Sequence, residues 1–192
     1  MSAHAAARLA WSLCAAATAL LALASVLPAL GASPRSDRLF ESIFTLMILT
    51  YAAVGAVVAT RRPGNPIGWV FCAFGLCAAV LAAAAEYAEF DPTGSAAALP
   101  EFAIGAWIAE WIALPTFGLL VFVLFLFPTG RSLSPRWRAA TWFAAGVLGG
   151  GAISVAFKPG TLGENSRPVD NPVGVEGTVG EALTAIAPCS TS

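Results

Sequence analysis

Long stretches without charge dominate the chain and predict its fold. Residues 9–34, 42–60, 63–85 and 139–157 contain no Asp, Glu, Lys or Arg, and residues 102–127 contain only Glu110. A helix needs about 20 mainly apolar residues to cross the hydrocarbon core of a bilayer. Because backbone groups in lipid need partners within their own segment, and no stretch alternates like a barrel strand, we predict an all-α fold. Residues 1–157 are expected to form a multi-pass transmembrane helical bundle, with about five membrane-spanning helices at 9–30, 43–60, 67–85, 102–127 and 139–157.

The remaining residues, 158–192, have a different composition. Residues 158–177 are rich in Gly, Pro, Asn and Glu, which is typical of a loop, and residues 178–187 have a helix-like pattern that Pro188 stops. About ten residues are too few to cross a bilayer. We therefore predict an extracytoplasmic loop followed by an incomplete sixth helix, and we expect the sequence to be truncated. Whether Ser192 is the natural C-terminus is left open.

Composition excludes a soluble domain. Hydrophobic residues make up 58% of the 192 residues and charged residues 11%, whereas about a quarter of the residues of a soluble domain are charged. A soluble fold of this length could not cover so much apolar surface.

The placement of charge predicts an orientation. With the N-terminus in the cytoplasm, the inner segments contain only basic charges, and these are Arg8, Arg61, Arg62, Arg131, Arg136 and Arg138. The outer segments then contain nearly all the acidic residues. Cytoplasmic loops of membrane proteins are enriched in Lys and Arg, so we predict a cell-membrane protein with its N-terminus inside and its C-terminal segment outside. A cleaved signal peptide is the alternative for residues 9–30, although this stretch is long for one and Leu30 is too large for the −3 position of a cleavage site after Ala32.

The sequence lacks the residue patterns of an enzyme. The single histidine, His4, lies near the N-terminus, and Cys14, Cys72, Cys77 and Cys189 form no CxxC pair. Paired carboxylates, histidine clusters and nucleophile–base pairs are absent from the sequence. The net charge of −1 is unlike the basic patch of a nucleic-acid-binding protein. We therefore expect no catalytic residue, cofactor or metal in this chain, and we expect the lipid bilayer, not nucleic acid, as its partner.

A tightly specified turn separates the second and third predicted spans. Two arginines hold the turn on the inner side, and a tryptophan reaches the interface. An asparagine is placed to cap the next helix, and a proline follows at the first helical position. The residues of this turn motif are Arg61, Arg62, Pro63, Asn65, Pro66, Gly68 and Trp69.

Two further turns carry comparable patterns. In the second inner turn a proline ends the fourth span, a glycine allows positive φ and arginines hold the loop inside. Its residues are Phe127, Pro128, Gly130, Arg131, Arg136, Trp137 and Arg138. The third motif, formed by Asn171, Pro172 and Gly174, repeats the Asn-Pro-x-Gly arrangement of residues 65–68. We expect this third motif to start the sixth helix.

Taken together, the three motifs resemble the N-terminal membrane region of sensor histidine kinases found in actinobacteria and related high-GC bacteria. In that family an RRPxNPIGW turn, an LFPTGR turn followed by RWR, and a later NPxG occur in this order between apolar spans, and the resemblance covers residues 43–174. It implies a dimeric receptor whose membrane helices relay a signal to a cytoplasmic helix pair and an ATP-binding domain. A response regulator would be a partner only through that kinase region, which these 192 residues do not contain.

Two questions stay open at the level of sequence. Glu110 lies about two turns into the fourth span, between Trp107 and Trp111. An ionisable residue within a span is a functional candidate by default, but a shallow Glu110 that reaches the headgroups is the alternative.

The chain as a whole is expected to be the sensory, signal-transducing membrane region of a two-component histidine kinase, and a homodimer through Gly146 and Gly150 is a weaker possibility. The alternative is a small multi-pass membrane protein of unknown role, namely an accessory protein, a remnant or a transporter fragment.

Overall fold

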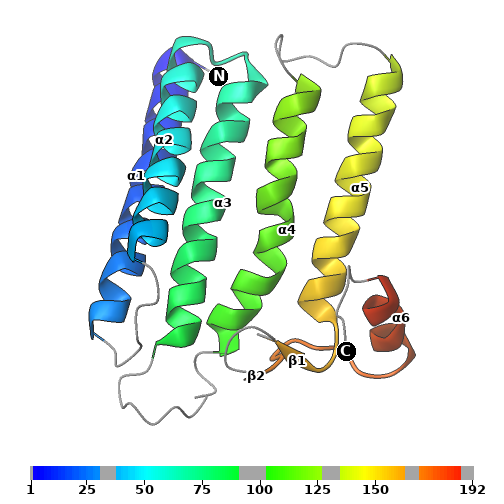
Figure 1. The fold of residues 1–192 in the computed structure, drawn as a ribbon. Helices are drawn as coiled ribbons and strands as arrows, with labels where there is room; N and C mark the ends of the chain where they lie inside the picture. Colours follow the sequence, from blue (N-terminus) through cyan, green and yellow to red (C-terminus); the bar gives the residue numbers. More distant parts are fainter. Residues whose placement is uncertain (1, 31–37, 91–102, 127–134, 163–168, 187–192) are drawn as a thin grey trace.

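The computed structural model describes residues 2–30, 38–90, 103–126, 135–162 and 169–186. These residues form an all-α bundle with a single two-stranded ribbon in the described part (Figure 1). The helices are α1 (Ala3–Leu30), α2 (Arg38–Arg61), α3 (Pro66–Glu89), α4 (Ala103–Leu126), α5 (Pro135–Phe157) and α6 (Thr178–Ile186). The strands β1 (Thr161–Leu162) and β2 (Val169–Asp170) pair antiparallel, with Thr161 opposite Asp170 and Leu162 opposite Val169.

Helices α1 to α5 are each long and apolar enough to cross a membrane. Of the five predicted spans, 9–30, 43–60, 67–85 and 139–157 each lie wholly within a helix of their own. The remaining span, 102–127, extends one residue beyond α4 at each end. The helices run up and down in turn, so that successive connections lie at opposite ends of the bundle (Figure 1). The structure thus supports a multi-pass membrane protein.

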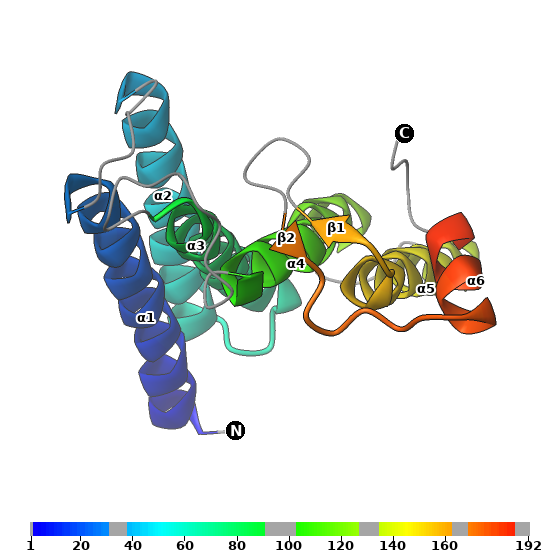
Figure 2. The ribbon, with the colours of Figure 1, turned by 90° about the horizontal axis from the view of Figure 1, so that it is seen from below.

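The five long helices form two parts. Helices α1, α2 and α3 contact one another in all three pairs, whereas α4 packs on α3 and α5 packs on α4. Seen from below, α1 to α3 form a triangle, and α4, α5 and α6 extend from it in a row (Figure 2). Because α5 has only α4 and the short α6 as extensive neighbours among the described elements, much of its surface faces outward.

Small residues allow α2 and α3 to pack closely. A Cβ atom at Gly55 would lie 2.6 Å from the backbone nitrogen of Cys72, and one at Gly75 would lie 2.7 Å from the Cβ atom of Ala52. Ile48 and Ala52 of α2 are buried in the same core cluster as residues of α1 and α3. The close helix contacts follow from the Gly and Ala content of these segments, as is common between membrane helices.

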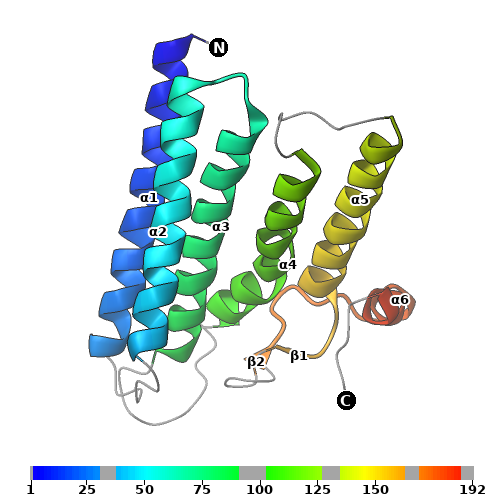
Figure 3. The same ribbon diagram turned by 45° about the horizontal axis from the view of Figure 1, so that its top comes forward.

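The two ends of the bundle differ in charge. The end that includes the start of α1, the α2–α3 turn and the start of α5 is called the arginine end, and its described charged residues are Arg8, Arg61, Arg62, Arg136 and Arg138. The opposite end, with β1, β2 and α6, is called the hairpin end, and Figure 3 shows the two ends at the top and bottom of the molecule. The described acidic residues all lie in the half of the bundle nearer the hairpin end.

One sequence prediction about the C-terminal segment is wrong. The Asn171-Pro172-x-Gly174 motif was expected to start the sixth helix, but α6 begins only at Thr178. Residues 171–177 form a turn at Pro172 and Val173 followed by irregular backbone. The physical reason is that this motif packs against the end of α5, as described below. Helix α6 itself has nine residues and lies beside the end of α5.

Candidate functional site: the turns and the junction of α4 and α5

The α2–α3 turn is closed by its own motif residues. The Asn65 side-chain oxygen accepts a hydrogen bond of 3.0 Å from the backbone N–H of Ile67, so Asn65 caps α3, and Pro66 stands in the first turn, where helical N–H groups have no intrahelical acceptor. The indole N–H of Trp69 donates to the carbonyl of Pro63 at 3.0 Å. The turn therefore needs no ligand to hold its shape.

Gly68, next to this turn, allows the start of α3 to pack closely against the end of α2. A Cβ atom there would lie 2.7 Å from the backbone nitrogen of Ala59 and 3.0 Å from Cγ1 of Val58, both in the last turns of α2. Only glycine leaves room for this approach of α3 to the α2 backbone. Arg61 and Arg62 remain exposed at the same turn, where they are free to face headgroups or solvent.

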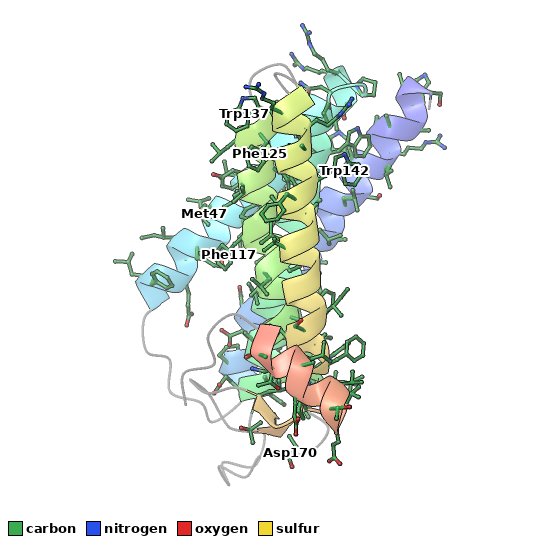
Figure 4. The ribbon with its side chains drawn as sticks, turned by 90° about the vertical axis from the view of Figure 1, so that its right-hand side faces the viewer. Met47, Phe117, Phe125, Trp137, Trp142 and Asp170 are labelled. Carbon is green, nitrogen blue, oxygen red and sulfur yellow. The ribbon has the colours of Figure 1, made fainter. Side chains whose placement is uncertain are left out.

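The second inner motif is described only in part. Arg136, Trp137 and Arg138 are exposed residues in the first turn of α5. The Trp137 ring packs at a tilt on Phe125 of α4, with 5.9 Å between ring centroids, and Figure 4 shows both near the arginine end. The other motif residues lie outside the described part of the chain, and these are Phe127, Pro128, Gly130 and Arg131.

Glu110 pairs with a lysine at the end of α5. Its Oε1 lies 3.4 Å from Nζ of Lys158, in a contact that is both a hydrogen bond and a salt bridge. The side chain of Lys158 is 11% exposed and that of Glu110 is 32% exposed. Lys158 directly follows the last residue of α5, and a positive charge there also interacts favourably with the helix dipole. The pair gives Glu110 a structural role.

The third motif closes the same end of α5. The Asn171 side-chain amide donates to the carbonyl of Ala156 at 3.1 Å and to that of Lys158 at 2.8 Å. The Asn171 oxygen accepts from the backbone N–H of Val173 at 3.0 Å. The last carbonyls of a helix have no intrahelical partner and are costly to leave unpaired in an apolar environment. The Asn171 side chain therefore provides hydrogen-bond donors for the carbonyls at the end of α5 and also stabilises its own turn.

Further contacts complete this helix end. The indole N–H of Trp107, on α4, also donates to the carbonyl of Ala156 at 2.8 Å, and the N–H of Val175 donates to the carbonyl of Phe157 at 3.0 Å. A Cβ atom at Gly174 would lie 3.2 Å from the carbonyl oxygen of Lys158. Side chains of α4 and the segment after β2 thus meet at the end of α5, in a cluster we call the α4–α5 junction.

The hydrogen bonds and the ion pair of the junction hold α4, α5 and the segment after β2 together. No group of three or more His, Cys, Asp or Glu residues lies together among the described residues. The indole nitrogen of Trp111, the residue after Glu110, is buried and has no hydrogen-bond partner within the described part of the chain. This N–H is a donor that a neighbouring acceptor could use.

Sequence reasoning identified Glu110 and Asn171 but missed what joins them. Lys158 is not among the predicted site residues, although it is the first charge after the fifth span. A single acid in one span and a single base at the end of the next are a signal for a pair between neighbouring helices. The capping of α5 by Asn171 had no such signal, because it joins residues 15 positions apart through a turn.

No family model, curated protein or solved structure matches the chain.

Proposed function

We propose that these residues form the membrane-embedded sensory region of a two-component sensor histidine kinase. The observation that carries the proposal is the ordered set of three turn motifs between apolar spans. The phosphoacceptor and ATP-binding parts would lie outside these 192 residues, so the chain itself would receive a signal and transmit it without performing catalysis.

The contacts of the motif residues support this interpretation. A sensory bundle needs helices that move as units, and both described Asn-Pro-x-Gly turns fix a helix end against a neighbouring segment. The α4–α5 junction would tie α4, α5 and the hairpin into one such unit. A stimulus that displaces α4 against α3 would then also displace α5 and the hairpin.

The proposed orientation places the arginine end in the cytoplasm. Its described charges are five arginines, and excess Lys and Arg is typical of cytoplasmic loops. In a cysteine-free background, Gly64→Cys and Asp170→Cys would carry a single thiol at the arginine end and at the hairpin end. A membrane-impermeant maleimide applied to intact cells should label only the Asp170→Cys protein, and labelling of only the Gly64→Cys protein would reverse the orientation.

Receptors of this class would be dimers, and α5 offers a face for the contact. A Cβ atom at Gly146, Gly149 or Gly150 would meet no atom within 4 Å. Trp142 and Phe143 on the same helix are each 75% exposed, and Figure 4 shows Trp142 on the outer side of α5. Replacing Gly150 with Leu should weaken cross-linking between two copies if α5 forms the interface, while Gly64→Leu serves as the control.

The test of the function itself is the nucleotide sequence for about two kilobases downstream of the Ser192 codon, a length sufficient for several domains. A sixth span, a histidine-containing helix pair and an ATP-binding domain are expected there. If neither those domains nor another output domain is encoded, the kinase proposal is wrong and only the membrane bundle stands.

A further inference from the structure

At the arginine end, two helices carry an exposed arginine followed about one turn later by an exposed tryptophan. On α1, the exposed Arg8 precedes Trp11, which is 50% exposed. On α5, the exposed Arg138 precedes Trp142, which is 75% exposed. Residues three or four positions apart lie on the same face of a helix. Each pair therefore presents a guanidinium group and an indole ring side by side, and we call these two pairs the Arg–Trp pairs.

Both Arg–Trp pairs have the same direction relative to the bundle. Helices α1 and α5 both begin at the arginine end (Figure 3), so in each pair the tryptophan lies deeper than the arginine. The difference along the helix axis is about 4.5 Å on α1 and about 6 Å on α5, at 1.5 Å per residue. The headgroup region on each side of a bilayer is roughly 5–8 Å thick. Each pair therefore matches the depth of this region, with the arginine at its outer side and the indole at the hydrocarbon boundary, where tryptophan is enriched.

The side chains of the Arg–Trp pairs have no partner within the described part of the chain. None of the four forms a hydrogen bond or an ion pair there. Residues 1–36, 42–85 and 111–157 contain no Asp or Glu, so the sequence neighbours of both pairs supply no carboxylate. Arg61 and Arg62 add two further exposed guanidinium groups at the same end. The arginine end thus has positive charge that the described residues do not neutralise.

We propose that each Arg–Trp pair binds one anionic phospholipid in the leaflet that surrounds the arginine end. The guanidinium group donates two parallel hydrogen bonds to phosphate oxygens, a geometry that its planar fork fits. The indole N–H, which lies deeper, donates to an ester carbonyl of the same lipid. A headgroup with net negative charge binds better than a zwitterionic one, because the described charges at this end are all arginines and no described carboxylate there can pair with a choline cation.

The two lipid sites have different surroundings and do not depend on each other. Helix α1 belongs to the triangle of α1, α2 and α3, whereas α5 lies in the row that extends from it (Figure 2). The pair on α1 is thus separate from the α5 face proposed for a dimer contact. The pair on α5 borders that face, because Gly146 follows Trp142 by four residues. The inference goes beyond the sensory proposal and needs only that the long helices span a membrane.

The direct test is native mass spectrometry of the whole chain, released from detergent micelles after titration with phosphatidylglycerol. We expect about two tightly bound lipids per chain, and phosphatidylcholine with the same acyl chains should bind at least about fivefold more weakly, since one arginine near an anionic surface contributes about that factor. Equal retention of the two lipids would overturn the proposal. Glycerol 3-phosphate has the phosphate without acyl chains, and displacement of the lipid by an equal concentration of it would identify a soluble anion as the ligand instead.

Variants on α5 separate a paired arginine from an unpaired one. Arg138→Gln should weaken binding of one of the two lipids by about fivefold. The matched control is Arg136→Gln, which removes the same charge from the same exposed turn. The residues three and four positions after Arg136 are Ala139 and Ala140, so this arginine has no tryptophan on its face, and the control should change affinity less than twofold. Equal losses in the two variants would indicate a diffuse basic surface and refute the site on α5.

Variants on α1 test the second site and the role of the indole. Arg8→Gln should weaken binding of the other lipid about fivefold, and Trp11→Phe should weaken it severalfold by removing one hydrogen-bond donor while keeping an aromatic ring. Unchanged binding in both variants would refute the site on α1.

The outcomes also distinguish the lipid sites from the proposed function. All substituted side chains are exposed, and size-exclusion profile and helical circular dichroism verify that each variant is folded. If an arginine variant does not fold, Trp11→Phe and the comparison of the two lipids still decide the result. Selective binding of phosphatidylglycerol without any output domain downstream would leave the lipid sites standing and remove the kinase proposal, and the converse result would do the opposite.

Discussion

The two Asn-Pro-x-Gly turns have the same sequence pattern and opposite tasks. In both, the asparagine oxygen accepts a 3.0 Å hydrogen bond from the N–H two residues later. In the first turn, Asn65 begins α3, and the glycine packs on the preceding helix. In the second turn, Asn171 reaches back with its amide group to end α5, and no helix follows until Thr178. The pattern specifies a local turn, and the neighbouring chain decides which helix end it serves.

The difference lies in which atoms of the asparagine are used. Asn65 uses its oxygen as an acceptor for the helix that it caps. Asn171 uses its oxygen in the same way but also uses its N–H₂ group as a donor to two carbonyls of another element. A cap on the first turn of a helix depends on short-range sequence, whereas the closure of α5 depends on tertiary contact. The variants below test this distinction.

The largest effect is expected at the glycine of the first turn. Gly68→Ala places a Cβ atom 2.7 Å from the backbone nitrogen of Ala59, and a backbone atom cannot move aside as a flexible side chain can. The free energy of unfolding should fall by about 3 kcal/mol, the upper part of the usual range for overpacking. Unfolding by SDS in mixed micelles would measure this, with Gly64→Ala as the control, because a Cβ atom at Gly64 meets nothing within 4 Å. Equal stability of the two variants would contradict the close contact.

The second largest effect is expected from Asn171→Asp. The carboxylate lacks the N–H donors that reach the carbonyls of Ala156 and Lys158, and it places a negative charge beside them. Two lost hydrogen bonds at about 1 kcal/mol each predict a loss near 2 kcal/mol. The same denaturation assay applies, and faster proteolysis near the end of α5 should accompany the loss. Wild-type stability in this variant would mean that the amide contacts contribute little.

The Glu110–Lys158 pair should contribute somewhat less. It is more enclosed than a surface pair, which contributes about 0–1 kcal/mol, and less enclosed than a buried one, whose disruption costs about 3–5 kcal/mol. Glu110→Gln is therefore expected to cost about 1–2 kcal/mol. Combining it with Lys158→Met in a double-mutant cycle measures the coupling directly. Additive effects of the two changes would show that the 3.4 Å contact does not stabilise the bundle. In the full receptor, a Glu110→Gln variant that signals like the wild type at every pH would refute a sensing or proton-linked role for this residue.

The sequence was sufficient for features that depend on neighbouring residues. The lengths of the uncharged stretches predicted the five long helices, and the Asn65-Pro66 pair predicted the start of α3. It was insufficient where distant segments meet. The Lys158 partner of Glu110 and the closure of α5 by Asn171 depend on how α4, α5 and the hairpin pack.

The smallest effect is expected for Asn65→Asp, and it gives the strictest test of the difference between the Asn65 turn and the Asn171 turn. Asp and Asn are about equally good helix N-caps, because each offers an oxygen to the first free N–H groups, and a negative charge at this end also interacts favourably with the helix dipole. Stability should change by no more than about 0.5 kcal/mol, whereas Asn65→Ala should cost about 1 kcal/mol. The same Asn→Asp replacement would thus be tolerated at position 65 and damaging at position 171, measured in the same micelles. Equal losses at the two positions would mean that both side chains act as donors, and the assignment of acceptor and donor roles that separates the two turns would be wrong.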